Sequence, residues 1–405
     1  MIANEPQTEQ NRCPVHHTQR KTQHVAATPA PIERSADGVW HIHGYAEARA
    51  VLRGEQTRQS GFRAEMMDVL PISIKRPILF QEGQPHHEQR RQTARFFTPK
   101  FTSEHYTALM ESQADQVIAG LRREGQADLS TLSMQLAVAV VAQVVGLTNS
   151  RMPGMERRLN AFFKNDNRLE GRSPQAIAQS LRSQSQLFWF YLVDVQPAIG
   201  ARRRTPGEDV ISHLIGRGYN GMSILTECIT YGAAGMVTTR EYIAIAAWHM
   251  LEQPALRQRF LVAGDDERRA ILAEILRIEP VIGVIHRRAT EDITLEQDGQ
   301  TITIKTGERI AVDVYSANAD VRLVGAEPEA ICPGRELADP RADAAVMSFG
   351  DGHHRCPGAY IALQETDIFL RKLLAIETLR IVSPPSVRRT KLAEGYELRN
   401  FTLAV

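Results

Sequence analysis

The chain has 405 residues, of which 43% are hydrophobic, and a formal net charge of +1. This length and composition allow a sizeable core, in one large enzyme fold or in two or three average domains. A charge so close to zero gives no overall field that would draw the chain to nucleic acid or to a membrane surface. The four cysteines are scattered and form no C-x-x-C pair, which predicts no disulfide framework and fits a reducing cytoplasm.

The N-terminal segment differs in composition from the rest of the chain. Residues 1–33 are rich in Gln, Thr, His and Pro and contain no apolar stretch typical of a signal peptide or a membrane anchor. We therefore expect a flexible tail over residues 1–33 and a folded part over residues 34–405. A cluster within the tail, formed by Cys13, His16 and His17, can bind metal adventitiously.

Apolar periodicity predicts a chain built mainly from helices, with a few short strands. Residues 58–79 instead form an irregular connection whose many apolar side chains suggest that it lines a pocket. Helices are expected at residues 45–52, 106–124, 131–146, 224–251, 267–278 and 359–374, and strands at 39–43, 301–304 and 308–314. The predicted fold class is therefore α+β, mainly α with small sheets.

A glycine-rich loop before the last predicted helix presents a single cysteine. Phe349, Gly352, Cys356 and Gly358 stand at the spacing F-x-x-G-x-x-x-C-x-G, in which the glycines allow a tight turn. Cys356 comes just before a helix N-terminus, where the helix dipole and unpaired N–H groups favour a thiolate. Three interpretations compete: a buried structural cysteine, a zinc site with the neighbouring histidines, and the axial ligand of a haem.

The predicted helix over residues 224–251 has an unusual centre made of small residues. A glycine inside a helix costs about 1 kcal/mol, so Gly232 and Gly235 need a reason, and the close approach of a flat cofactor would provide one. Thr238 and Thr239 can bond back to the preceding turn, which often bends a helix.

Five segments resemble, in the same order, the motifs of soluble bacterial-type cytochromes P450. They are residues 84–91 with 97–99, 234–239, 274–277, 286–293 and 349–358. The resemblance extends from about Asp37 to the C-terminus. It implies the P450 fold, a single large triangular domain with a long central oxygen-binding helix, and haem b (iron protoporphyrin IX) as the cofactor.

The resemblance also implies roles for single residues at the haem. Cys356 would be the axial ligand of the iron, and Thr238, with Thr239 and Gly235, would act at the oxygen site. His86, Arg90, Arg287 and His354 would hold the haem propionates. The cofactor contacts are completed by Phe349, Gly350, Gly358 and Ala234.

The E-x-x-R motif has a structural role in the family that the chain resembles. Glu274 and Arg277 lie one helical turn apart and can form an ion pair. Counting back from the cysteine loop, Arg341 is expected to close the pair and brace the proximal side of the haem.

One position departs from the family pattern. Val237 stands where the family usually has an acid that helps to bring protons to the oxygen. Glu241, one turn beyond Thr238, can substitute for that acid or can instead pair with Arg240. Otherwise, proton delivery depends on Thr238, water and a polar group of the substrate. The residues expected to line the substrate pocket are Met66, Leu70, Ile78, Met236, Val237, Val281, Ile282 and Tyr396.

The function implied by the resemblance is that of a cytoplasmic, monomeric haem-thiolate monooxygenase. It would insert one atom of O2 into a small organic substrate, with electrons from a ferredoxin and its reductase. An external donor is expected because the chain has neither a flavin fingerprint nor a cysteine cluster for iron–sulfur. The alternatives are a peroxide-using peroxygenase, another P450-type oxidation such as ring coupling, and a non-catalytic haem sensor.

Overall fold

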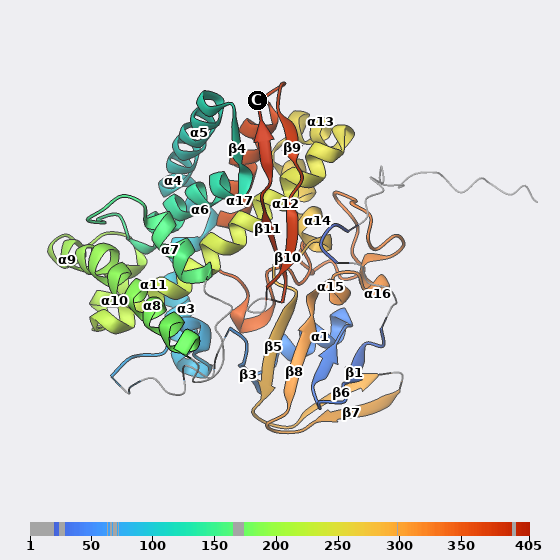
Figure 1. The fold of residues 1–405 in the computed structure, drawn as a ribbon. Helices are drawn as coiled ribbons and strands as arrows, with labels where there is room; N and C mark the ends of the chain where they lie inside the picture. The colour runs from blue at the N-terminus through green and yellow to red at the C-terminus, as the bar shows by residue number, and fades with distance from the viewer. Residues whose placement is uncertain are drawn as a thin grey trace, which may run out of the picture.

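The computed structural model describes residues 20–23, 29–62, 64, 67, 71, 73–164, 174–297, 299–390 and 394–405. Most helices gather on one side of the molecule and the largest sheet lies on the other, with α12 between them (Figure 1). The α-helices of the first half are α1 (Tyr45–Arg53), α3 (Gly83–Thr93), α4 (Pro99–His105), α5 (Thr107–Glu124), α6 (Leu129–Val145), α7 (Met155–Lys164), α8 (Pro174–Phe190), α9 (Gln196–Arg204) and α10 (Val210–Gly216). Those of the second half are α11 (Gly221–Gly232), α12 (Thr238–Glu252), α13 (Pro254–Val262), α14 (Asp265–Ile278), α15 (Val314–Ala317), α16 (Val321–Val324) and α17 (Ala359–Leu374).

Short helical turns of other types connect these helices. They include η1 (Ile78–Phe80), η2 (Ala94–Phe97), η3 (Tyr191–Val195) and η5 (Gly352–His354). The prediction of a mainly helical chain with small sheets is confirmed. None of the described helices is long and apolar enough to cross a membrane.

The strands form small sheets. The largest has the order β1 (Ile32–Arg34), β2 (Trp40–Ile42), β8 (Arg309–Asp313), β5 (Val284–Ala289) and β3 (Thr57–Gln59). The smaller sheets join β6 (Ile293–Gln297) to β7 (Gln300–Ile304), β10 (Ser386–Arg389) to β11 (Tyr396–Arg399), and β12 (Thr402–Ala404) to both β4 (Gln126–Asp128) and β9 (Arg380–Ser383). Strand β5 lies between β8 and β3, so Arg287 is held in register by Ile310 on one side and Gln59 on the other.

The long central helix is interrupted at its middle. Helix α11 begins at the Asn220 cap, whose side chain accepts a hydrogen bond from the Ser223 N–H, and α12 ends at Glu252. Between them, residues 233–237 form a π-helical turn, η4 (Ala233–Val237). The expected bend at the small-residue centre therefore takes the form of a wider turn, a feature that is frequent at functional sites. One core cluster packs α12 against α5, α6, α14 and α17.

The extent of the N-terminal tail differs from the prediction. Arg20 is buried, its guanidinium lies over the Tyr315 ring at 5.2 Å from the centroid, and Nη1 lies 3.3 Å from Glu329. The hydroxyl of Thr22 lies 3.0 Å from that of Tyr315. Residues 20–22 thus pack on the folded part, because charged and aromatic residues far along the chain contact them. Strand β1 also begins within the predicted tail, at Ile32.

The cysteines differ in part from the expectation of reduced thiols. Cys228 and Cys356 are free, whereas Cys332 is disulfide-bonded. Cys228 lies in the core, where burial raises the pKa of its thiol far above the usual value. A buried thiol of this kind is inert, so Cys356 is the candidate for chemistry among the two free cysteines.

A buried ion-pair network braces the loop that precedes the cysteine. Glu274 and Arg277 are joined by two hydrogen bonds of 2.8 Å, and Arg277 is fully buried. Arg335 closes this pair, with its Nε 3.0 Å from Glu274 Oε1. Arg335 also donates to several backbone carbonyls of the segment from Val324 to Ala330.

The prediction that Arg341 closes this network is wrong. Its side chain is 83% exposed and lies 3.5 Å from Asp339. Arg335 and Arg341 precede the cysteine in the same irregular loop, and sequence spacing in a loop does not determine which side chain turns inward.

We expect Arg335→Ala to lower the free energy of unfolding, because it removes one partner of a buried charged group. The typical cost is about 3–5 kcal/mol. Thermal unfolding should therefore show a clear loss of melting temperature, while the matched variant Arg341→Ala should unfold like the wild type. Equal melting temperatures for both variants would contradict the assignment of Arg335 to the network.

Candidate active site

The cysteine loop is shaped by close backbone approaches. Gly350 and Gly352 have φ of 68° and 67°, and a Cβ atom at Gly352 would lie 2.1 Å from the carbonyl oxygen of Leu52. The N–H of Cys356 donates to the Phe349 carbonyl at 2.8 Å. Gly358 is the N-cap of α17, so the half-buried thiol of Cys356 lies at the start of that helix, as expected.

Opposing effects act on the pKa of the Cys356 thiol. Burial raises the pKa, whereas the backbone N–H of Gly358 and the charges of Arg90 and Arg355 lower it. Arg90, on α3, donates to the carbonyl of Arg355 at 2.5 Å and so ties α3 to the loop. The net effect is a raised pKa. A thiol in this setting becomes a thiolate readily when a metal cation binds it.

A second group of side chains, which we call the carboxylate cradle, consists of His86, Arg287 and His354. Arg287, on β5, is 3% exposed, and its Nε and Nη1 have no hydrogen-bond acceptor among the described residues. The His86 ring stacks on the His354 ring with centroids 4.1 Å apart. His86 is buried, which lowers its pKa to about 3, and its Nδ1 also lacks a partner among the residues described.

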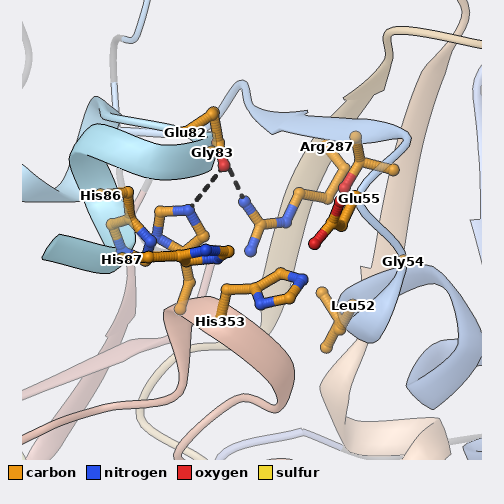
Figure 2. Close-up of a pocket in the computed structure, with 11 residues that line it drawn as sticks. Leu52, Gly54, Glu55, Glu82, Gly83, His86, His87, Arg287 and His353 are labelled. Atoms are coloured by element: carbon orange, nitrogen blue, oxygen red, sulfur yellow. Dashed lines mark hydrogen bonds and ion pairs between the residues drawn. The ribbon is translucent and has the colours of Figure 1, made fainter. Parts of the chain in front are cut away.

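Glu82 was not recognised as a site residue in the sequence. Its carboxylate accepts from His354 Nε2 at 2.9 Å and lies 3.7 Å from Arg287 Nη1 (Figure 2). The only signal was that Glu82 directly precedes residues 83–91, a stretch that overlaps one of the segments resembling P450 motifs. Arg287 and His354 thus already accommodate one carboxylate, that of Glu82.

The centre of the long helix presents an open strip. Ala234 is exposed and Val237 and Thr238 are half-buried, although most neighbouring positions of α11 and α12 are buried. The Thr238 hydroxyl donates to the Ala234 carbonyl. The strip of Ala234, Val237 and Thr238 therefore faces open space with small side chains and one hydroxyl.

The reason for Gly235 differs from the one expected. A Cβ atom at Gly235 would lie 2.6 Å from Cγ2 of Val141, so this glycine allows α6 to pack closely on the helix. Met236, expected in the pocket, is fully buried in a core cluster that also contains Val141. Helix packing, rather than the approach of a cofactor, explains these two positions.

The other predicted pocket residues occupy different environments. Val281 is buried against the turn at Gly395, where a Cβ atom would lie 1.9 Å from the Val281 carbonyl oxygen, and Ile282 is half-buried. The hydroxyl of Tyr396 donates to the carbonyl of Glu279 at 3.1 Å. Ile78 is buried in the core. Met66 and Leu70 lie outside the described residues.

Two buried acids differ in their surroundings: Glu241 follows Thr238 by three residues, and Glu365 is hydrogen-bonded to Thr239. Glu241 accepts hydrogen bonds from Arg240, Arg399 and the Leu398 N–H at 2.7–2.8 Å, so its carboxylate is occupied by structural partners. Glu365, on α17, was missed in the sequence. Burial raises its pKa to about 8, and it accepts a hydrogen bond from Thr239. Of these two acids, Glu365 is therefore the one that can take up and release a proton near neutral pH.

Comparisons with known proteins agree with this arrangement. The sequence model of the family Cytochrome P450 matches residues 269–387, which include Glu274, Arg287 and Cys356. The mycinamicin IV hydroxylase/epoxidase of Micromonospora griseorubida is 24% identical over 94% of this chain and 91% of its own length. The pulcherriminic acid synthase of Bacillus subtilis is 26% identical over 84% and 83%.

The chain belongs to the cytochrome P450 superfamily. Solved P450 structures share its fold. CalO2 superposes with a TM-score of 0.76 at 22% identity over 92% of both chains. P450BioI, solved with an acyl carrier protein that bears hexadec-9Z-enoic acid, gives a TM-score of 0.73 at 20% identity over 92% of this chain and 95% of its own. The chain is accordingly an oxidoreductase of the P450 type.

The residues of this P450 fit a haem. A free, half-buried cysteine can bind the iron, and the buried Arg287 and His86 supply polar atoms that lack partners and suit propionates. The small side chains of the open strip around Ala234 leave space for a bound haem, which larger side chains would fill.

We expect Arg287→Ala to speed the loss of haem from the purified protein by about tenfold or more, because a buried charged hydrogen bond to a propionate would be lost. Transfer of haem to an apo-globin acceptor measures this rate. The matched variant is Arg288→Ala, since Arg288 is its neighbour on β5 and bonds to the Gly307 carbonyl at 2.9 Å. Haem loss that is equally fast in both variants would refute the role of Arg287.

Proposed function

We propose that this P450 is a haem-thiolate monooxygenase that inserts one oxygen atom of O2 into a small organic substrate. The observation that carries the proposal is the pairing of a free cysteine at the start of α17 with the carboxylate cradle beside the same loop. A haem bound there would supply the activation of O2 and the cleavage of the O–O bond, which a thiolate ligand favours.

In the proposed reaction, these residues would have the following roles. Cys356 would bind the iron as a thiolate; burial raises the pKa of its thiol, and the charges of Arg90 and Arg355 offset part of that rise. The carboxylate cradle would bind the propionates and so orient the haem. Ala234 and Val237 would present an apolar surface to the oxygen, and the hydroxyl of Thr238 would hold a proton next to it.

Proton delivery in this proposal takes a route without the usual acid. Val237 cannot carry a proton, and Glu241 is committed to its arginine partners. Thr239, the direct neighbour of Thr238, is instead hydrogen-bonded to the buried Glu365. We assign to this pair and to water the supply of protons to Thr238.

The electron donor is proposed to be a ferredoxin with its reductase. The exposed cations Arg91, Arg95 and Arg355 lie on α3, on η2 and in the cysteine loop. A positive surface near the thiolate favours an acidic partner and raises the rate of encounter. For the substrate, the hydroxylase and epoxidase names of the relatives support oxygen insertion into a C–H bond or a double bond.

A peroxygenase is the second candidate, and Val237 is the observation that favours it. An enzyme that receives its oxygen from hydrogen peroxide needs no acid to deliver protons to bound O2. Turnover with hydrogen peroxide alone, compared with turnover with ferredoxin, reductase and NAD(P)H, separates the two candidates.

The test of thiolate ligation is the spectrum of the reduced protein with carbon monoxide. The wild type should show the red-shifted Soret band of a thiolate-bound haem, and Cys356→Ala should lose it. Cys228→Ala is the matched control, because Cys228 is the other free cysteine but lies in the core. Retention of the band in Cys356→Ala would overturn the proposal.

The role of Thr238 can be measured as the ratio of product formed to NAD(P)H consumed. Thr238→Ala should lower this ratio by about tenfold or more and raise the yield of peroxide, because general acid–base groups contribute at least that much. Thr230→Ala is the control, since the Thr230 hydroxyl makes the same kind of bond, to the Thr226 carbonyl at 2.9 Å. If both variants couple like the wild type, Thr238 has no part in proton delivery.

A further inference from the structure

Two pairs of histidines connect α3 with the cysteine loop. The inner pair, His86 and His354, belongs to the carboxylate cradle. The outer pair, His87 and His353, consists of their direct neighbours in the sequence, and its ring centroids lie 4.9 Å apart. This outer pair has no role in the proposed oxidation chemistry.

A carboxylate completes the outer pair. Glu55, in the connection between α1 and β3, offers an oxygen, and the ligand atoms of Glu55, His87 and His353 all lie within 4.8 Å of one another. The three side chains are among those that line a cavity of about 120 Å³ (Figure 2). Nε2 of His353 is buried and has no hydrogen-bond partner among the described residues, although an imidazole nitrogen in such a place normally has one.

We propose that Glu55, His87 and His353 form a zinc-binding site beside the carboxylate cradle, in a cavity that both groups line. Two imidazoles and one carboxylate are a common ligand set for Zn²⁺, with water in the fourth position. The Zn–N and Zn–O distances are about 2.0–2.2 Å, so the three ligand atoms must draw together slightly when the ion binds. Glu55 is exposed, and rotation of its side chain can supply that movement.

The charges around the cavity permit a cation. Glu55 and Glu82 contribute two negative charges, and Arg287 contributes one positive charge that already lies beside Glu82. The surroundings therefore carry a net negative charge before zinc binds.

Zinc at this site would join three separate segments of the chain. Glu55 follows α1, His87 lies on α3, and His353 lies on η5 in the cysteine loop. An ion bound only by the folded protein stabilises it by mass action, so zinc should raise the melting temperature of the haem-loaded enzyme. The inference concerns a site of its own and does not depend on the proposed monooxygenase activity.

Zinc binding can be measured directly on the full-length, haem-loaded protein. After treatment with a chelator, the protein is dialysed against ZnCl2 and bound zinc is counted by elemental analysis. We expect one zinc ion per chain at this site and a higher melting temperature. Mg²⁺, which prefers oxygen ligands, should produce neither effect.

Substitutions decide whether the bound zinc belongs to this cluster. Glu55→Gln, His87→Gln and His353→Asn should each weaken zinc binding by more than about tenfold, since even partners outside the ligand set often contribute that much. Glu55→Gln is the cleanest variant, because an exposed loop residue can change without loss of folding. Glu88→Gln and His41→Gln are the matched controls and should bind zinc like the wild type.

The N-terminal cluster requires its own control. A double variant, His16→Asn with His17→Asn, should retain the zinc and the rise in melting temperature. Loss of zinc in that variant, or full binding in all three cluster variants, would overturn the proposal. So would a wild type that binds no zinc. Because none of these measurements uses turnover or the carbon monoxide spectrum, their failure is distinguishable from failure of the proposed function.

Discussion

The buried guanidinium of Arg287 is the constraint around which the site is arranged. A charge that is 3% exposed must be paired, since an isolated ion in a protein interior is very costly. Its partner Glu82 lies just before α3, and the same carboxylate reaches His354 in the cysteine loop. One anionic position thus brings together a central strand, the start of a helix and the loop that carries the reactive thiol.

The parts of the chain proposed to hold the cofactor and the parts around the space above it are held in place by different interactions. The sheet with β5, helix α3 and the cysteine loop are joined by charges and close backbone contacts. The long central helix is instead held by packing, with α6 pressed so closely that only glycine fits at position 235. In the proposed function, charge would therefore fix the position of the haem edge, and packing of small residues would fix the space available to oxygen and substrate.

Much of this could be predicted from the sequence, because short-range patterns encode it. The glycine–cysteine loop, the E-x-x-R pair and the small-residue centre of the helix each depend on residues that are neighbours in the chain. The contacts that were missed join distant segments. Glu82 with His354, Glu365 with Thr239 and Arg335 with Glu274 need the folded chain before they can be recognised. Arg335 and Arg341 show this directly, since nothing in their local sequence distinguishes the buried arginine from the exposed one.

The π-helical turn over residues 233–237 acts as an inserted residue within an otherwise regular helix. Each residue of an α-helix advances by about 100°, so one extra residue changes which side chains on the two halves share a face. Deletion of a single residue here would convert the interrupted helix into a regular α-helix while both of its ends kept their positions. The open strip of Ala234, Val237 and Thr238 would then be split between two directions. The register of the helix, as much as the identity of its side chains, would therefore decide which residues face the oxygen in the proposed reaction.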